Sequence, residues 1–166
     1  MPIARRPSRL ALATAVVLAL AAAPAPATAA GPAKAPVKIG ALFAITGPAS
    51  FLGAPEARTL ELVVERANAA GGLGGAPIQL IIKDTGGDAA KAGSFARQLI
   101  EEEQVFAIVG PSTSGETLAV KKIAEEGKTL LLSCAAAEAI VQPVASWVFK
   151  TPQNDSHAVQ KIIERI

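Results

Sequence analysis

Cysteine, histidine and tyrosine supply much of the chemistry of active sites and metal sites, and they are scarce here. The sequence contains one cysteine, Cys134, one histidine, His157, and no tyrosine. A single cysteine excludes an intrachain disulfide and a metal site built from thiolates. No nucleophile elbow, phosphate-binding glycine loop or metal-ligand spacing occurs either. We therefore expect a protein that is not an enzyme and that uses no cofactor and no metal. The alternative is an α/β enzyme whose catalytic residues lie outside this sequence.

The isolated reactive residues have ordinary structural interpretations. Cys134 has no histidine near it in the sequence to activate its thiol, so we expect a small buried side chain. We expect His157 on the solvated face of a helix and Trp147 in the core. Asp84 follows an apolar run, where a turn-forming aspartate is more common than a ligand-binding one.

The N-terminal apolar run is short. Residues 10–23 carry no charge, and three arginines precede them. A bilayer span takes about 20 residues, whereas a signal peptide needs a shorter apolar segment after a positive start. The small residues Ala27 and Ala29 suit signal peptidase, which predicts a signal peptide over residues 1–29 and cleavage before Ala30. We therefore expect the mature protein to be exported; a retained N-terminal anchor is the alternative.

Basic charge is not in excess in the expected mature protein. The whole sequence has 16 basic and 14 acidic residues and a formal charge of +2. Three of the 16 basic residues belong to the predicted signal peptide, so 13 remain against 14 and the charge becomes −1. This balance gives no support for a nucleic-acid partner.

Apolar runs and helical stripes alternate after a Pro- and Ala-rich stretch, which we interpret as a tether over residues 30–36. Continuous apolar runs are typical of strands buried on both faces, and they occur at residues 37–46, 78–83, 105–109, 129–132 and 147–150. Helical patterns lie between them, near residues 55–70, from Asp88 onward, over residues 114–126, and as a short turn at 136–141. Strict alternation predicts an α/β fold, a doubly wound parallel sheet with helices on both faces.

The last residues form an apolar helical stripe. It consists of Ala158, Val159, Ile162, Ile163 and Ile166. Exposed isoleucines on a terminal helix are a liability, so we expect another part of the protein to cover them. We interpret the sequence as a fragment of a longer chain; a homodimer that buries the stripe is the alternative.

The loop after the third predicted strand is the most informative candidate site. Ligands of open parallel sheets bind outside the carboxyl ends of the strands. Here Ser112, Thr113 and Ser114 combine three hydroxyls with a helix N-terminus, where unpaired N–H groups and the helix dipole attract an anion such as a carboxylate. The spacing of Thr113 and Glu116 also fits a capping box, which satisfies the helix's own donors. Both interpretations can hold together.

Five segments carry a resemblance to a known family. They are VKIG at residues 37–40 leading to TGP at 46–48, ERANAAGGLGG at 65–75, Asp84, VGPSTSG at 109–115 and SCAAAE at 133–138. In this order they resemble the leucine/isoleucine/valine-binding proteins, which are periplasmic solute-binding components of ABC transporters. The match runs from residue 37 to residue 166.

The resemblance implies a type I periplasmic-binding-protein fold, in which a solute is captured between two α/β lobes. Residues 37–152 would be the N-terminal lobe, and residues 153–166 the start of the second. The partner implied is an ABC permease in the inner membrane, and the ligand a branched-chain or related amino acid. An exported sensor module of a signalling system is the rival function.

The family's ligand positions map onto this sequence one residue at a time. A serine and three alanines would hold the carboxylate and amino group of the ligand, an aspartate lies at the crossing between lobes, and two apolar residues line the pocket for the ligand's side chain. These residues are Ser114, Ala135, Ala136, Ala137, Asp155, Phe51 and Leu52. The hydroxyls of Ser112 and Thr113 belong to the same candidate site.

One of these positions departs from the family. A serine or threonine is usual at the place of Ala137, where its hydroxyl helps to hold the ligand's polar end. An alanine side chain cannot form hydrogen bonds. An aromatic or aliphatic carboxylate is therefore an alternative to a standard α-amino acid.

Overall fold

Five parallel strands form the central sheet of the protein, for which the computed structural model describes residues 34–166. The strands are β1 (Val37–Phe43), β2 (Ile78–Asp84), β3 (Ala107–Val109), β4 (Leu130–Ser133) and β5 (Val148–Lys150). Their order is β2-β1-β3-β4-β5, and every neighbouring pair is parallel. This confirms the predicted α/β parallel sheet. The predicted signal peptide lies outside the described residues.

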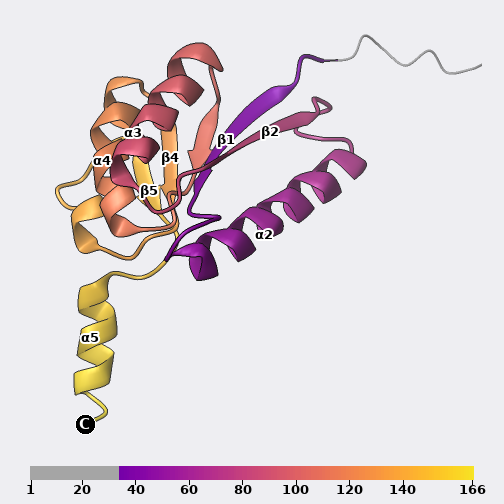
Figure 1. Cartoon of the computed structure of the whole chain (residues 1–166). Helices are drawn as coiled ribbons and strands as arrows, with labels where there is room; N and C mark the ends of the chain where they lie inside the picture. Colours follow the sequence, from indigo (N-terminus) through magenta and orange to yellow (C-terminus); the bar gives the residue numbers. More distant parts are fainter. Residues whose placement is uncertain (1–33) are drawn as a thin grey trace, which may run out of the picture. The chain divides into compact units, whose positions relative to one another are not determined.

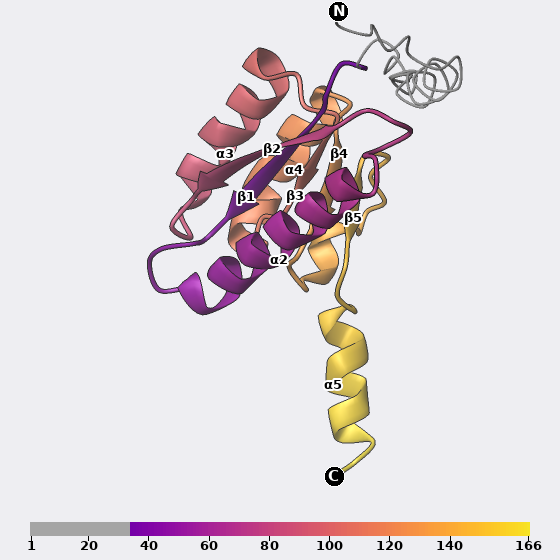
Figure 2. The ribbon, with the colours of Figure 1, turned by 90° about the vertical axis from the view of Figure 1, so that its right-hand side faces the viewer.

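Helices cover both faces of the sheet (Figures 1 and 2). These helices are α2 (Ser50–Ala69), α3 (Ala89–Arg97) with a π-helical turn at Gln98–Glu102, and α4 (Ser114–Glu126). A short 3-10 turn at Glu138–Ile140 and the helix α5 (Asp155–Ile163) follow in the chain. Because side chains of a strand alternate between faces, Leu42 packs with the α3 and α4 residues Ala92 and Val120. Ala41 and Phe43 pack instead with Ala57 of α2. The strands are therefore apolar on both sides, as the continuous apolar runs predicted.

The chain changes direction across the sheet between β1 and β3. From β1 it moves outward to β2, and it then crosses back so that β3 pairs with the other side of β1. In doubly wound sheets, the crevice at such a switch point, outside the carboxyl ends of the strands, is where ligands bind. The loops after β1 and β3 therefore flank the position where a site is expected.

Helix α2 begins earlier than the sequence pattern predicted. It starts at Ser50 rather than near Pro55, and Pro55 lies inside it. A proline is tolerated in a first helical turn but removes one helical hydrogen bond further in, so placing Pro55 at the start was a reasonable but wrong prediction. Gly53 permits the earlier start, since a Cβ there would collide with the backbone of Ala44. As a result, Phe51 and Leu52 belong to the first turn of a helix and not to a loop.

Two large apolar side chains are exposed, and the sequence predicted one of them, Trp147, in the core. Val63 lies on α2, which contacts β1 and β2, and is 55% exposed. Trp147 precedes β5 instead of belonging to it and is 38% exposed. Its backbone N–H donates to Glu125 of α4.

Helix α5 has no buried residue. It projects away from the sheet in both views (Figures 1 and 2). Its isoleucines Ile162, Ile163 and Ile166 are all exposed, which agrees with the apolar stripe seen in the sequence. Within residues 34–166, no helix is both long enough and apolar enough to span a bilayer.

Candidate functional site

The loops after β1 and β3 are joined through the side chain of Ser112. Its hydroxyl oxygen accepts a hydrogen bond from the backbone N–H of Ala44 at 3.1 Å, and the hydroxyl donates one to Glu56 Oε2 at 2.5 Å. Ser112 is buried. Gly110, two residues earlier, has a φ of +93° and lies so close to the Leu42 backbone that a Cβ would collide with it. These contacts fix the two loops against each other at the switch point, and they leave the Ser112 hydroxyl no proton for a ligand.

Asp84 holds the loop after β1 from the neighbouring strand. Its Oδ1 accepts the backbone N–H groups of Ile45, Thr46 and Gly86, and its Oδ2 accepts the Thr46 hydroxyl at 2.6 Å. The Thr46 hydroxyl and these N–H groups stabilise the carboxylate and lower the pKa of Asp84. Asp84 is therefore a loop-forming residue, as its position after a strand indicated.

The N-terminus of α4 has the capping box that the sequence predicted. The Thr113 hydroxyl oxygen accepts the Glu116 N–H, while Glu116 Oε2 accepts both the N–H and the hydroxyl of Thr113. Glu116 is fully buried, and its Oε1 has no hydrogen-bond partner among the described residues. The hydroxyl of Thr113 is thus committed to the helix itself.

Ser114 is the residue of this loop whose hydroxyl can still donate. Its oxygen accepts the backbone N–H of Ala137 at 3.3 Å, and within residues 34–166 its proton has no acceptor. Ser114 is the first residue of α4, where the N–H groups lack partners inside the helix and the dipole is positive. The bond from Ala137 also ties the loop after β4 to this helix end. Ser114 can therefore donate to an anion that lies against α4.

A pocket of about 350 Å³ opens beside these residues at the carboxyl ends of β3 and β4. Six of the nine predicted ligand residues line it: Leu52, Ser112, Thr113, Ser114, Ala135 and Ala136. The other three do not. Phe51 is 73% exposed in the first turn of α2, Ala137 contacts Ser114 through its backbone, and Asp155 is exposed at the start of α5.

Two charged residues, one lining this pocket and one bonded to a residue that lines it, were missed from the sequence. Glu56 lines the pocket from α2. Lys150, at the end of β5, donates through Nζ to the carbonyl oxygens of Ala136 and Gln153. Lys150 lies at the carboxyl end of β5, and Glu56 lies in the helix that follows β1. Because ligands of open parallel sheets bind outside the carboxyl ends of the strands, both positions could have been considered from the sequence. Their contacts are long-range, and no local motif marks them.

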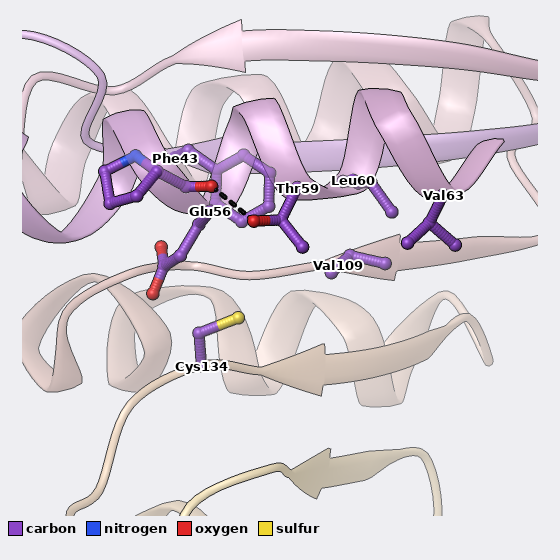
Figure 3. A pocket seen from close by; sticks show the side chains of 8 residues that line it. Phe43, Glu56, Thr59, Leu60, Val63, Val109 and Cys134 are labelled. Carbon is purple, nitrogen blue, oxygen red and sulfur yellow. Dashed lines mark hydrogen bonds between the residues drawn. The ribbon is translucent and has the colours of Figure 1, made fainter. Parts of the chain in front are cut away.

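A second, more apolar pocket of about 370 Å³ adjoins the first on the α2 side of the sheet (Figure 3). Glu56 and Cys134 line both pockets. Burial, with a smaller contribution from Glu56, raises the pKa of the Cys134 thiol to about 11. The thiol is therefore protonated at neutral pH. Cys134 is half-buried and lines both pockets, and is not the fully buried side chain that the sequence predicted. No cluster of His, Cys, Asp and Glu suited to a metal ion occurs in the described part of the chain.

Comparison with known proteins identifies the family. A family described as "Periplasmic binding protein" matches residues 36–166. The chain belongs to the periplasmic binding protein family. The predicted resemblance is thereby confirmed, and with it the assignment of the sheet as part of a type I periplasmic binding protein.

Relatives within this family are named for amino-acid binding and for chemotaxis. Leu/Ile/Val-binding protein homolog 7 of Brucella abortus is 41% identical over 96 residues, which are 58% of this chain and 24% of the relative. BasB of Halobacterium salinarum, a chemotactic signal transduction system substrate-binding protein, is 36% identical over 128 residues, covering 73% of this chain and 31% of the relative.

A solved structure shares the fold. The branched-chain amino acid transporter substrate-binding protein LivJ of Streptococcus pneumoniae, in complex with isoleucine, superposes with a TM-score of 0.70 and 32% identity. The match covers 73% of this chain and 35% of LivJ. The chain thus spans about a quarter to a third of the length of the proteins it resembles.

Proposed function

We propose that this periplasmic binding protein is the solute-binding component of an ABC transporter and captures a branched-chain or related amino acid, or another small carboxylate. The observation that carries the proposal is Ser114, which lines a pocket at the carboxyl ends of the strands with a hydroxyl proton available at the start of α4. The relatives named for leucine, isoleucine and valine support the amino-acid class.

The chemistry of the α4 start favours a carboxylate at this position. A capped helix still presents N–H groups of its first turn, and these interact with a negative charge through the helix dipole. The capping box uses the N–H of Glu116, and the N–H groups of Ser114 and Gly115 precede it. Together with the Ser114 hydroxyl they form a set of donors suited to one carboxylate.

We further propose that the capture site is completed by a second lobe. Residues 37–152 would form the N-terminal lobe, and residues 153–166 the start of the second. The absence of any buried residue in α5 supports this division, because the helix has no packing surface within the first lobe. In this arrangement Asp155 and Phe51, both exposed, would face the cleft. The predicted signal peptide over residues 1–29 would deliver the protein to the periplasm.

Replacing Ser114 tests the site. In the full-length protein, Ser114→Ala removes a hydrogen bond to a charged group, which contributes about 1.5–3 kcal/mol, so the affinity for a bound amino acid should fall roughly 10- to 150-fold. Calorimetry with L-leucine and L-phenylalanine measures the change, and the melting temperature shows whether the variant is folded. A variant that melts early yet binds normally would mean that the hydroxyl serves only to hold Ala137, and the site assignment would be wrong.

A sensory role is the second candidate, favoured by the similarity to BasB. A sensor and a transport component can use the same capture site, so affinity does not separate them. Deleting the gene does: loss of amino-acid uptake with normal chemotaxis supports transport, whereas normal uptake with loss of the chemotactic response to the amino acid supports the sensor.

A further inference from the structure

Glu56 occupies the boundary between the two pockets. Figure 3 shows its side chain reaching from α2 toward Cys134. It lines the polar pocket beside Ser112, Thr113 and Ser114 and also the apolar pocket beside Phe43 and Val109. A ligand with an apolar body in one pocket and a carboxylate at α4 would therefore pass directly by this side chain.

The Glu56 carboxylate is held in place. Its Oε2 accepts the Ser112 hydroxyl, and the Ser112 oxygen is itself fixed by the N–H of Ala44. Neither bond brings a positive charge. The ion pairs within residues 34–166 are Lys38–Glu103, Lys122–Glu126 and Lys161–Glu164, and none includes Glu56.

The surroundings of Glu56 favour a cation. Burial raises the pKa of Glu56, the Ser112 hydroxyl lowers it, and the negative charge of Glu116 raises it again, with a net increase. The negatively charged form is therefore less stable here than in water, and a positively charged group in the pocket would stabilise it. A ligand that carried only a carboxylate would instead be repelled by it.

The remaining polar groups of the pocket fit the opposite end of such a ligand. Ser114 accepts the Ala137 N–H and keeps a hydroxyl proton available at the start of α4. Lys150 does not line the pocket, but it places a positive charge beside it by donating to the carbonyl of Ala136, which does. Ala137 offers no side-chain group for an ammonium. The pocket thus has negative charge on α2 and hydrogen-bond donors on α4.

We infer that Glu56 accepts the ammonium group of the ligand, so that the pocket selects zwitterionic α-amino acids over carboxylates that lack the amino group. This inference rests on the proposed capture of a carboxylate-bearing solute. It makes Glu56 a specificity-determining residue. Because of Glu56, the pocket would prefer amino acids to the aromatic and aliphatic carboxylates that the alanine at position 137 suggested as alternative ligands.

Matched probe pairs test the inference in the full-length protein. L-Leucine is compared with 4-methylpentanoate, and L-phenylalanine with 3-phenylpropanoate, by calorimetry on the wild type, Glu56→Gln and the control Glu65→Gln. Glu65 lies exposed on the same helix and does not line the polar pocket. We expect Glu56→Gln to weaken binding of the amino acid roughly 10- to 100-fold, as expected for a lost hydrogen bond between charged groups, and to leave the affinity for the des-amino analogue equal or higher. Glu65→Gln should match the wild type.

The possible outcomes separate the two proposals. Equal weakening of both members of a pair would mean that Glu56 only shapes the pocket, and unchanged amino-acid binding would mean that it does not contact the ligand; either result overturns the inference. A wild type that binds the des-amino carboxylate but not the amino acid overturns the inference and leaves carboxylate capture standing. A wild type that binds none of the four probes overturns the proposed ligand class and the inference with it.

Discussion

Three consecutive hydroxyl groups precede or begin α4, and each makes a different set of contacts. Ser112 is buried between Ala44 and Glu56, Thr113 caps the helix, and Ser114 keeps its proton available at the pocket. The chemical group is the same in all three, so their roles depend on where the backbone directs each side chain. Substitutions at these positions should therefore affect stability and binding in different proportions.

Thr113 should affect stability more than binding. Loss of the N-cap costs about 1 kcal/mol, and loss of the hydroxyl donor to the buried Glu116 carboxylate adds a further penalty of about 1–3 kcal/mol. We expect Thr113→Ala to lower the free energy of unfolding by about 2–4 kcal/mol, measured by urea denaturation. Thr113→Ser keeps the hydroxyl and should lose less than half of that. An equal loss in both variants would show that the threonine methyl group, and not the cap, stabilises this turn.

At the scale of the elements, the loop between β1 and α2 depends on a residue of another strand. Asp84 at the end of β2 binds the backbone of Ile45 and Thr46, and β1 and β2 are in register so that Phe43 lies opposite Asp84. The position of α2, and of Glu56 on it, therefore depends on a carboxylate that is distant in sequence. The loop should respond to the ionisation of that carboxylate.

The stabilisation from Asp84 should be lost in acid. Because its pKa is lowered in the folded protein, the contribution is fully present above the ordinary aspartate pKa of about 3.9 and is lost as the pH falls through the folded-state pKa. Asp84→Asn keeps an acceptor but not the charge. We expect the wild type to be more stable than this variant at pH 7, with the gap in melting temperature closing below about pH 4. A gap that stays constant down to pH 2.5 would contradict this assignment.

The element boundaries show where local patterns mislead. The capping box at Thr113 was predicted, as was a helix from Asp88 onward, and both residues form caps, because a cap is a contact over two or three residues. The start of α2 was misplaced at Pro55. The helix begins at Ser50 because Gly53 allows its first turns to approach the backbone of Ala44, which follows β1. The apolar periodicity of the helix does not reveal this contact.

At the scale of the whole molecule, the described unit carries a polar pocket at the carboxyl ends of β3 and β4. The polar pocket opens beside residues of α2, α4 and the loop after β4, and α5 leaves the sheet from the same end (Figure 1). Under the two-lobe proposal, the opposite wall would come from residues that follow. Ligand contacts would then be shared between the lobes.

Residues 31–166 alone should consequently bind poorly. We expect their affinity for the amino acid to be at least 100-fold below that of the full-length protein, equivalent to about 2.7 kcal/mol, since each 1.4 kcal/mol is a factor of ten. Calorimetry on the isolated segment, with circular dichroism to confirm that it is folded, measures the difference. Micromolar binding by the folded segment would overturn the two-lobe arrangement.

The sequence by itself determined the alternation of strands and helices, the two caps and the place of Ser114 at the first turn of α4. These features follow from periodicity and from hydrogen bonds between near neighbours, which a single segment contains. Only the tertiary structure decided that the Ser112 hydroxyl donates to Glu56 and that Lys150 donates to the carbonyl of Ala136. It also decided that Leu52 lines the pocket while Phe51 is exposed to solvent. Each of these depends on how strands distant in sequence pair and on how a helix is rotated against the sheet. Strand pairing and helix rotation depend on packing among many residues at once, so they cannot be predicted from the pattern of a single segment.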